Sequence, residues 1–279
     1  MHIVHTIKEV RAQIKLWRNE GLSVGYIPTM GFLHEGHASL IKKASEENDR
    51  VVVSIFVNPI QFGPNEDFEK YPRDLKRDSY ICSSNGAHLI FAPEPSEMYV
   101  QNNSTFVDVE NITEGLCGAK RPGHFKGVCT VVSKFFNIIS PDRAYFGEKD
   151  AQQLAVIRKM VIDLNFNIEI VGCPIVREPD GLALSSRNTY LSAEERKAAL
   201  ILNKSLKLAK ASLEAGEKNP SEIKRTIIDE LSKEPLAKID YVEVVDSLSL
   251  KPIDSINNKI LVAIAVYIGK TRLIDNFSF

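Results

Sequence analysis

Short runs of β-branched and aromatic residues alternate with longer helical patterns over roughly the first 175 residues, and this alternation limits the possible fold most strongly. The run VVVSIFV at 51–57 is apolar without alternation, as expected for a strand buried on both faces of a sheet. Strands separated by helix-length segments predict βαβ units and a parallel sheet. Further strands are expected at 23–28, 87–93, 143–147 and 167–176, and helices at 37–48, 71–86, 125–140 and 150–164.

The pattern changes after about residue 180, where helices come first and strands follow. A capping box of Ser192 and Glu195 opens the first of these helices. The expected elements are helices at 191–217 and 219–233 and strands at 238–246 and 259–269. The predicted fold is therefore α/β: a Rossmann-like, doubly wound parallel sheet over 1–176, followed by a smaller α+β lid domain over 177–279.

Composition excludes several classes of protein. The formal net charge is -1, with 35 basic and 36 acidic residues among 279, so we expect no nucleic-acid partner and no anionic membrane. The four cysteines are too widely spaced for a Cys-x-x-Cys metal or redox motif. The N-terminus lacks the apolar core of a signal peptide, and no run reaches the ~18 apolar residues of a membrane span. We therefore expect a cytoplasmic protein.

Two histidines in PTMGFLHEGHASL (28–40) follow the first expected buried strand and lead into a helix. Three interpretations of His34 and His37 compete: a metal site, helix capping with core packing, or phosphate binding at a helix N-terminus. The helix start favours anions, and a neutral imidazole still donates one hydrogen bond. A histidine pair three apart does not match the H-E-x-x-H zinc motif, so the metal interpretation is the weakest.

Four later segments carry polar and cationic side chains near strand ends, helix starts or the domain junction. They are 56–78, 119–130, 145–153 and 181–188. No Ser-His-Asp or Cys-His nucleophile pattern appears, and neither a Walker A lysine nor a G-x-G-x-x-G motif is present. Together the segments favour a nucleotide-handling transferase that works by positioning and electrostatics.

Six motifs in order resemble the pantoate–β-alanine ligase (pantothenate synthetase) family: PTMGFLHEGHASL, SIFVNPIQF, YPRDLKRD, RPGHFKGV, FGEKDAQQL and DGLALSSRN. The resemblance extends from the N-terminus to TRLIDN at 271–276 and places the chain among nucleotidylyltransferases with a His-x-Gly-His signature. It implies an ATP-dependent ligation of D-pantoate to β-alanine through a pantoyl adenylate, in vitamin B5 and coenzyme A biosynthesis. AMP and pyrophosphate are released. It further implies Mg²⁺ with the ATP, no tightly bound organic cofactor, and a homodimer.

The resemblance also assigns residues to roles. It makes His34, His37 and Lys149 catalytic, and it makes Asp78 a metal neighbour, although some family members carry a second acid where this chain has Arg77. The implied ATP-binding residues are Met30, Gly36, His37, Gly147, Lys149, Asp150, Val176, Leu184, Ser185, Ser186 and Arg187. The implied pantoate-binding residues are Pro28, Met30, Phe56, Asn58, Gln61, Val132 and Gln153, and those for β-alanine are Gln61, Tyr71 and Arg121. His124 matches a family position without a clear role.

Two rival functions remain open from the sequence. A related nucleotidylyltransferase with a different acceptor would retain the nucleotide in its product, whereas a ligase releases AMP. An RNA-binding module, such as a fragment of a tRNA synthetase, shares the His-x-Gly-His turn, but the near-zero net charge argues against it.

Overall fold

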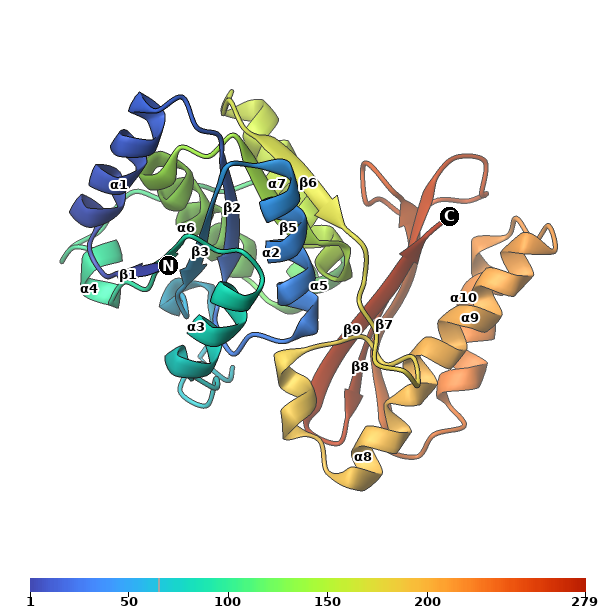
Figure 1. Cartoon of the computed structure of the whole chain (residues 1–279). Helices are drawn as coiled ribbons and strands as arrows, with labels where there is room; N and C mark the ends of the chain where they lie inside the picture. The colour runs from blue at the N-terminus through green and yellow to red at the C-terminus, as the bar shows by residue number, and fades with distance from the viewer. Residues whose placement is uncertain (65) are drawn as a thin grey trace. The chain divides into compact units, whose positions relative to one another are not determined.

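The computed structural model describes residues 1–64 and 66–279 and divides into two compact units (Figure 1). The first unit comprises 1–110, 121–148 and 153–174, and the second comprises 111–120, 149–152 and 175–279. Two short segments within the first 174 residues thus belong to the second unit. The main change of unit, between Pro174 and Ile175, lies two residues before the boundary expected from the sequence.

The first unit is built on a six-stranded parallel sheet, as predicted. Its strand order is β1-β4-β3-β2-β5-β6. The strands are β1 (His2–Val4), β2 (Val24–Thr29), β3 (Arg50–Ile55), β4 (Leu89–Phe91), β5 (Arg143–Gly147) and β6 (Glu169–Cys173). The order reverses between β2 and β5, and ligands of such sheets bind beyond the strand ends at this switch point.

Helices cover both faces of this sheet, because successive side chains of a strand point to opposite sides. The ring of Tyr26 in β2 packs against Phe135 and Phe136, whereas the next residue, Ile27, lies in a core cluster with Ile41. Figure 1 shows the helices around the sheet. They are α1 (Ile7–Asn19), α2 (Glu35–Glu47), α3 (Leu75–Ser84), α4 (Pro95–Met98), α6 (His124–Ile139) and α7 (Ala151–Asp163).

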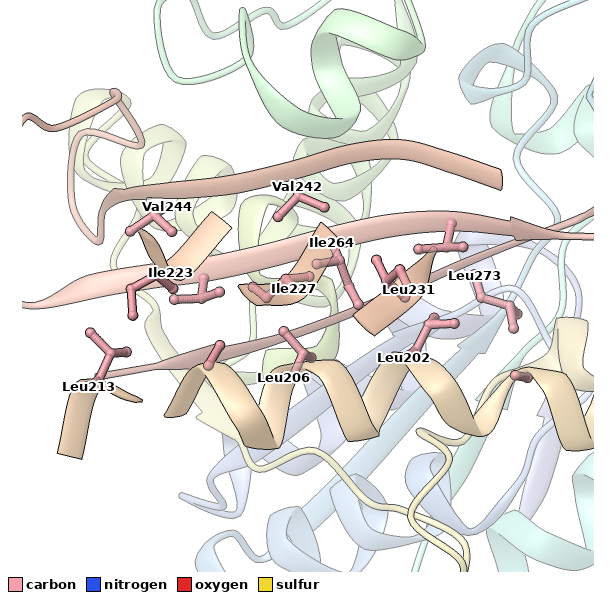
Figure 2. Packing of buried hydrophobic residues seen from close by; sticks show 14 of the residues in the cluster. Leu202, Leu206, Leu213, Ile223, Ile227, Leu231, Val242, Val244, Ile264 and Leu273 are labelled. Carbon is pink, nitrogen blue, oxygen red and sulfur yellow. The ribbon is translucent and has the colours of Figure 1, made fainter. Parts of the chain in front are cut away.

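The second unit is a small α+β assembly, also as predicted. Its sheet is antiparallel in the order β7-β8-β9, with β7 (Ala237–Asp246), β8 (Ile260–Ile268) and β9 (Thr271–Ser278). Its helices are α5 (Leu116–Lys120), α8 (Ala193–Ala198), α9 (Leu200–Glu214) and α10 (Pro220–Leu231). Figure 2 shows its core, in which Leu202, Leu206 and Leu213 of α9 and Ile223, Ile227 and Leu231 of α10 lie with Val242, Val244, Ile264 and Leu273 of the strands.

Several expected boundaries were wrong for local reasons. The helix expected over 191–217 is interrupted at Ala199, whose ψ of -20° tightens the turn, although the capping box of Ser192 and Glu195 is present. The helix expected from residue 71 begins only at Leu75, because the Asp74 side chain caps it by accepting from the amide of Arg77. The short strand β1 and the last strand β9 were not expected.

Candidate functional site

The turn after β2 is held in an unusual backbone shape. Gly31 and Phe32 both have positive φ, at 82° and 49°, which is uncommon for a residue other than glycine. The carboxylate of Asp78 in α3 fixes this turn by accepting from the amides of Phe32 and Leu33 at 2.8 and 2.7 Å. Burial raises the pKa of Asp78, and these amide hydrogen bonds offset part of that effect. Asp78 therefore anchors the histidine turn.

His34 and His37 form a capping box at the start of α2. The Nδ1 of His34 accepts from the amide of Gly36 at 3.1 Å, and the Nδ1 of His37 accepts from the amide of His34 at 3.3 Å. A backbone amide can only donate, so each neutral ring carries its proton on Nε2. The two rings lie 4.1 Å apart between centroids.

This geometry unites two of the interpretations left open by the sequence. The histidines cap the helix through Nδ1, and through Nε2 each is a hydrogen-bond donor at a helix N-terminus, where anions are favoured. The metal interpretation gains no support, because both Nδ1 atoms accept from amides. Among the residues that the structure describes, no group of three or more His, Cys, Asp or Glu side chains is arranged to hold a metal.

The turn after β3 brings together three of the residues expected to bind pantoate. Asn58 precedes a short helical turn over Pro59–Gln61, and Gln61 is the last residue of that turn. Both side chains are buried. The Nδ2 of Asn58 donates to Oε1 of Gln61 at 2.9 Å, and the Nε2 of Gln61 lies 3.2 Å from the sulfur of Met30. Residues distant in sequence thus lie together beyond the ends of neighbouring strands. We call the paired amides of Asn58 and Gln61, with Met30 beside them, the polar shelf.

The other expected pantoate residues lie on several elements of the first unit. Pro28 is within β2, Phe56 directly follows β3, and Val132 is buried in α6. The Phe56 ring packs against Phe135, one turn further along α6 than Val132. Gln153 lies half-buried in the first turn of α7.

Arg121 is held by a carboxylate that sequence reasoning missed. Its Nε and Nη2 donate to the two oxygens of Glu66 at 2.6 and 2.7 Å, a bidentate pair. Burial alone would raise the pKa of Glu66, but the hydrogen bond and charge of Arg121 bring the pKa below its usual value. Tyr71, the other residue expected at β-alanine, is buried with its ring against Phe62.

His124 connects Arg121 to the polar shelf. The Nη1 of Arg121 lies 2.9 Å from Nε2 of His124, and Nδ1 of His124 lies 2.9 Å from the carbonyl oxygen of Gln61. Because arginine only donates and a carbonyl only accepts, the ring accepts at Nε2 and donates from Nδ1. His124 is therefore the neutral tautomer opposite to that of His34 and His37.

The end of β5 carries Gly147, and a Cβ added there would meet no atom within 4 Å. In the second unit, the next turn carries Lys149 and Asp150, whose charged groups are 3.7 Å apart. The side chain of Asn276 in β9 donates to the carbonyl of Lys149 at 2.8 Å. Gln152 donates to the carbonyls of Ile112 and Gly115 at 2.9 Å, so the Lys149 turn is tied to other segments of its own unit.

The remaining residues expected at ATP lie on one loop of the second unit. The amide of Leu184 donates to the carbonyl of Val176 at 3.0 Å, which pairs the two ends of the loop. Ser185 begins a short helical turn, Ser186–Tyr190, by accepting from the amide of Arg187. This turn contains the buried Ser186.

Four residues that hold the expected residues in place were not predicted from the sequence: Glu66, Gln152, Asn276 and Tyr99. The Tyr99 hydroxyl donates to Oδ1 of Asn58 at 2.7 Å. Glu66 and Arg121 are 55 residues apart, and Asn276 and Lys149 are 127 apart. The adjacent glutamines of DAQQ were a signal for Gln152, because successive helical side chains point about 100° apart and so meet different surroundings.

Comparisons with known proteins agree over the whole chain. The sequence profile of the family described as pantoate-beta-alanine ligase matches residues 2–278. A pantothenate synthetase of Clostridium botulinum is 67% identical over 279 residues, which is 100% of this chain and 99% of that protein. A pantothenate synthetase of Clostridioides difficile is 64% identical over 277 residues, 99% of this chain and 98% of that protein.

Solved structures agree in fold. The pantothenate synthetase from Thermus thermophilus has a TM-score of 0.93 and 45% identity, covering 99% of both chains. The pantoate-beta-alanine ligase from Francisella tularensis, complexed with beta-gamma ATP and β-alanine, has a TM-score of 0.81 and 39% identity and covers 99% of this chain and 97% of its own. In residues 1–64 and 66–279, no helix combines the length and the apolar character needed to cross a membrane.

Proposed function

This chain belongs to the pantoate–β-alanine ligase family, and we propose that it joins D-pantoate to β-alanine through a pantoyl adenylate. In the first step, a carboxylate oxygen of pantoate bonds to the α-phosphorus of ATP, the bond to the bridging β-phosphate oxygen breaks, and pyrophosphate leaves. In the second step, the neutral amine of β-alanine bonds to the acyl carbon. The carbon–oxygen bond to AMP then breaks, and the nitrogen loses a proton to water.

The observation that carries this proposal is the histidine capping box. His34 and His37 are oriented by backbone amides so that each neutral ring has its proton on Nε2. Donors fixed before the reaction stabilise charge that develops on phosphate oxygens, and they need no reorganisation during it. These two groups would bind the phosphates of ATP, with Gly36 allowing close backbone approach at the helix start.

The second unit would supply further phosphate and nucleoside contacts. Lys149 would bind phosphate oxygens, and the hydroxyls of Ser185 and Ser186 with the guanidinium of Arg187 add donors of the kind that phosphates accept. Met30, Gly147, Asp150, Val176 and Leu184 complete the proposed ATP set. Support for these roles comes from the family membership.

Pantoate would lie on the polar shelf of the first unit. Gln61 offers an amide donor beside the half-buried Met30, and Asn58 orients that amide. Pro28, Phe56, Val132 and Gln153 belong to the same proposal. The amine of β-alanine would arrive near Gln61, whose backbone is joined through His124 to Arg121; Tyr71 is assigned with them.

Mg²⁺ would accompany ATP, but the residues around Asp78 do not fit a metal site of the protein itself. Both oxygens of Asp78 accept from backbone amides, and the neighbouring side chain is the cation Arg77. We therefore derive no step from a metal bound there. Homodimerisation stays a prediction, which sedimentation analysis measures directly, and the cytoplasmic location also stays a prediction.

The proposal is tested by incubating the protein with ATP, Mg²⁺, D-pantoate and β-alanine. We expect pantothenate and AMP to form in equal amounts. When β-alanine is omitted, labelled pyrophosphate should still exchange into ATP, provided that pantoate is present. Exchange that does not require pantoate would overturn the adenylate step. A product that retains the nucleotide would instead identify a nucleotidylyltransferase with another acceptor.

A further inference from the structure

The amide of Asn58 has its orientation fixed by a backbone carbonyl. Asn58 is 1% exposed, and its Nδ2 lies 3.1 Å from the carbonyl oxygen of Gly127 in α6. A carbonyl oxygen only accepts, so the nitrogen of the side-chain amide must face it. The oxygen of the amide, Oδ1, then faces the hydroxyl of Tyr99 at 2.7 Å, and Tyr99 must be the donor.

The same orientation passes on to Gln61. The Nδ2 of Asn58 also lies 2.9 Å from Oε1 of Gln61, so the carbonyl of Gln61 is turned toward Asn58. The Nε2 of Gln61 is thereby turned toward Met30. Sulfur is a weak acceptor, which leaves this amide nitrogen able to donate to a stronger acceptor on a ligand.

We propose that Tyr99 is a positioning residue for the pantoate-binding step. Its hydroxyl satisfies Oδ1 of Asn58 and so holds the amide that the Gly127 carbonyl orients, which makes Gln61 present an N–H donor instead of a carbonyl. This inference rests on the proposed function, because it takes the shelf of Asn58 and Gln61 as the pantoate site. Pantoate carries a carboxylate and two hydroxyls, all of which accept hydrogen bonds. An amide turned the other way would offer its carbonyl oxygen, which cannot donate to a carboxylate.

The surroundings of Tyr99 suit this task. Tyr99 directly follows α4, and its amide donates to the carbonyl of Pro95 at 2.8 Å, which fixes the backbone. Its ring lies 6.3 Å from that of Phe56 and beneath the ammonium of Lys134, at 5.5 Å from the ring centroid. An ordinary tyrosine hydroxyl is already protonated at neutral pH, and burial raises the pKa of Tyr99 further, so the hydroxyl remains available as a donor.

The test is Tyr99→Phe, which removes the hydroxyl and leaves the buried acceptor of Asn58 without it. We expect the KM for pantoate to rise about five- to tenfold, the effect of one neutral hydrogen bond, while the KM for ATP stays unchanged. Tyr26→Phe is the matched control, since the Tyr26 hydroxyl is bonded to Ser54 in the core at 2.7 Å. Equal changes of both KM values in Tyr99→Phe would overturn the inference.

A double-mutant cycle separates positioning from general packing. If Tyr99 acts through Gln61, pantoate affinity measured by calorimetry should fall in Tyr99→Phe, yet adding this change to Gln61→Ala should lower it no further. Additive losses would overturn the inference. Wild-type protein without pantoate-dependent pyrophosphate exchange would instead refute the proposed function, so the two failures are distinguishable.

Discussion

The proposed function gives His34 two tasks, carried by two atoms of one ring. Its Nδ1 accepts from the amide of Gly36 and caps α2, while its Nε2 is the donor assigned to ATP. Asparagine is among the best capping residues and would keep the first task, but its short side chain lacks a donor at the position of Nε2. The two tasks can therefore be separated by substitution.

We expect His34→Asn to preserve helix α2 but to slow adenylate formation. Its free energy of unfolding should stay within about 0.5 kcal/mol of wild type, because the cap is conserved. The rate of pantoate-dependent pyrophosphate exchange should fall about 10²–10³-fold, as for loss of one preorganised donor, and His34→Ala should lose about 1 kcal/mol of stability in addition. An exchange rate equal to wild type in either variant would remove the proposed role.

The carboxylate of Glu66 should make the free energy of unfolding depend on pH. Because the folded protein holds its pKa below the ordinary glutamate value of about 4.3, its carboxylate adds stability above that value. This contribution is lost as the pH falls through the folded pKa. Urea unfolding of Glu66→Gln should therefore show a smaller loss of stability below about pH 4.3 than wild type. Glu20→Gln, at an exposed helix end, is the charge-matched control. The prediction would be contradicted if Glu66→Gln and wild type lost the same free energy of unfolding below about pH 4.3.

At the scale of elements, the sequence predicts periodic features well and contacts between distant segments poorly. The apolar face of α2 was visible as Leu40, Ile41 and Ala44, and all three are buried. The interruption at Ala199 was not visible, because alanine is a strong helix former and only the local ψ ends the helix there. Strand β9 was missed because its polar residues Asp275 and Asn276 are buried, against the usual alternation.

The candidate site shows the same division. Residue types at strand ends predicted the histidines, Gln61 and Lys149 as candidate site residues, because local motifs carry chemical information. The residues that orient them could not be found in this way. Tyr99 reaches Asn58 across 41 residues, and a hydrogen bond over that separation depends on the completed fold.

Gly127 controls how closely α6 approaches the turn of Gln61. A Cβ at this position would lie 2.5 Å from the carbonyl oxygen of Ile60 and 2.6 Å from the Cα of Gln61. Both are backbone atoms and cannot rotate away. Glycine is disfavoured in a helix interior, so its presence here reflects this contact.

Gly127→Ala should therefore destabilise the protein although alanine is the better helix former. Overpacking should cost about 1–3 kcal/mol of unfolding free energy, against the gain of about 0.5–1 kcal/mol expected from helix propensity alone. The KM for pantoate should rise with it, because α6 carries the carbonyl that orients Asn58. Asn137→Ala, on the exposed side of α6, is the control. A Gly127→Ala variant more stable than wild type would contradict the prediction. It would show that the backbone of Ile60 and Gln61 can move away from the added Cβ without loss of stability.

At the scale of the whole molecule, the chain changes unit immediately before Lys149. Strand β5 ends in the first unit at Gly147, whereas residues 149–152 belong to the second unit. The second unit holds this turn by the amide of Asn276 on the carbonyl of Lys149 and by Gln152 on the segment around Ile112. The last strand of the chain thus holds the backbone of Lys149, the residue whose ammonium group is proposed to bind ATP.

Asn276→Ala should weaken ATP use and spare pantoate. Loss of a neutral hydrogen bond of about 1 kcal/mol predicts a rise of about fivefold in the KM for ATP, with the KM for pantoate unchanged because its shelf lies within the first unit. Asn85→Ala removes a comparable amide, which donates to the carbonyl of Ile81 at 2.8 Å, and serves as control for stability. Steady-state kinetics with each substrate varied in turn gives both constants. If the KM for pantoate rose in parallel, Asn276 would be acting on general stability, and the assignment of the Lys149 turn to the second unit would have no functional meaning.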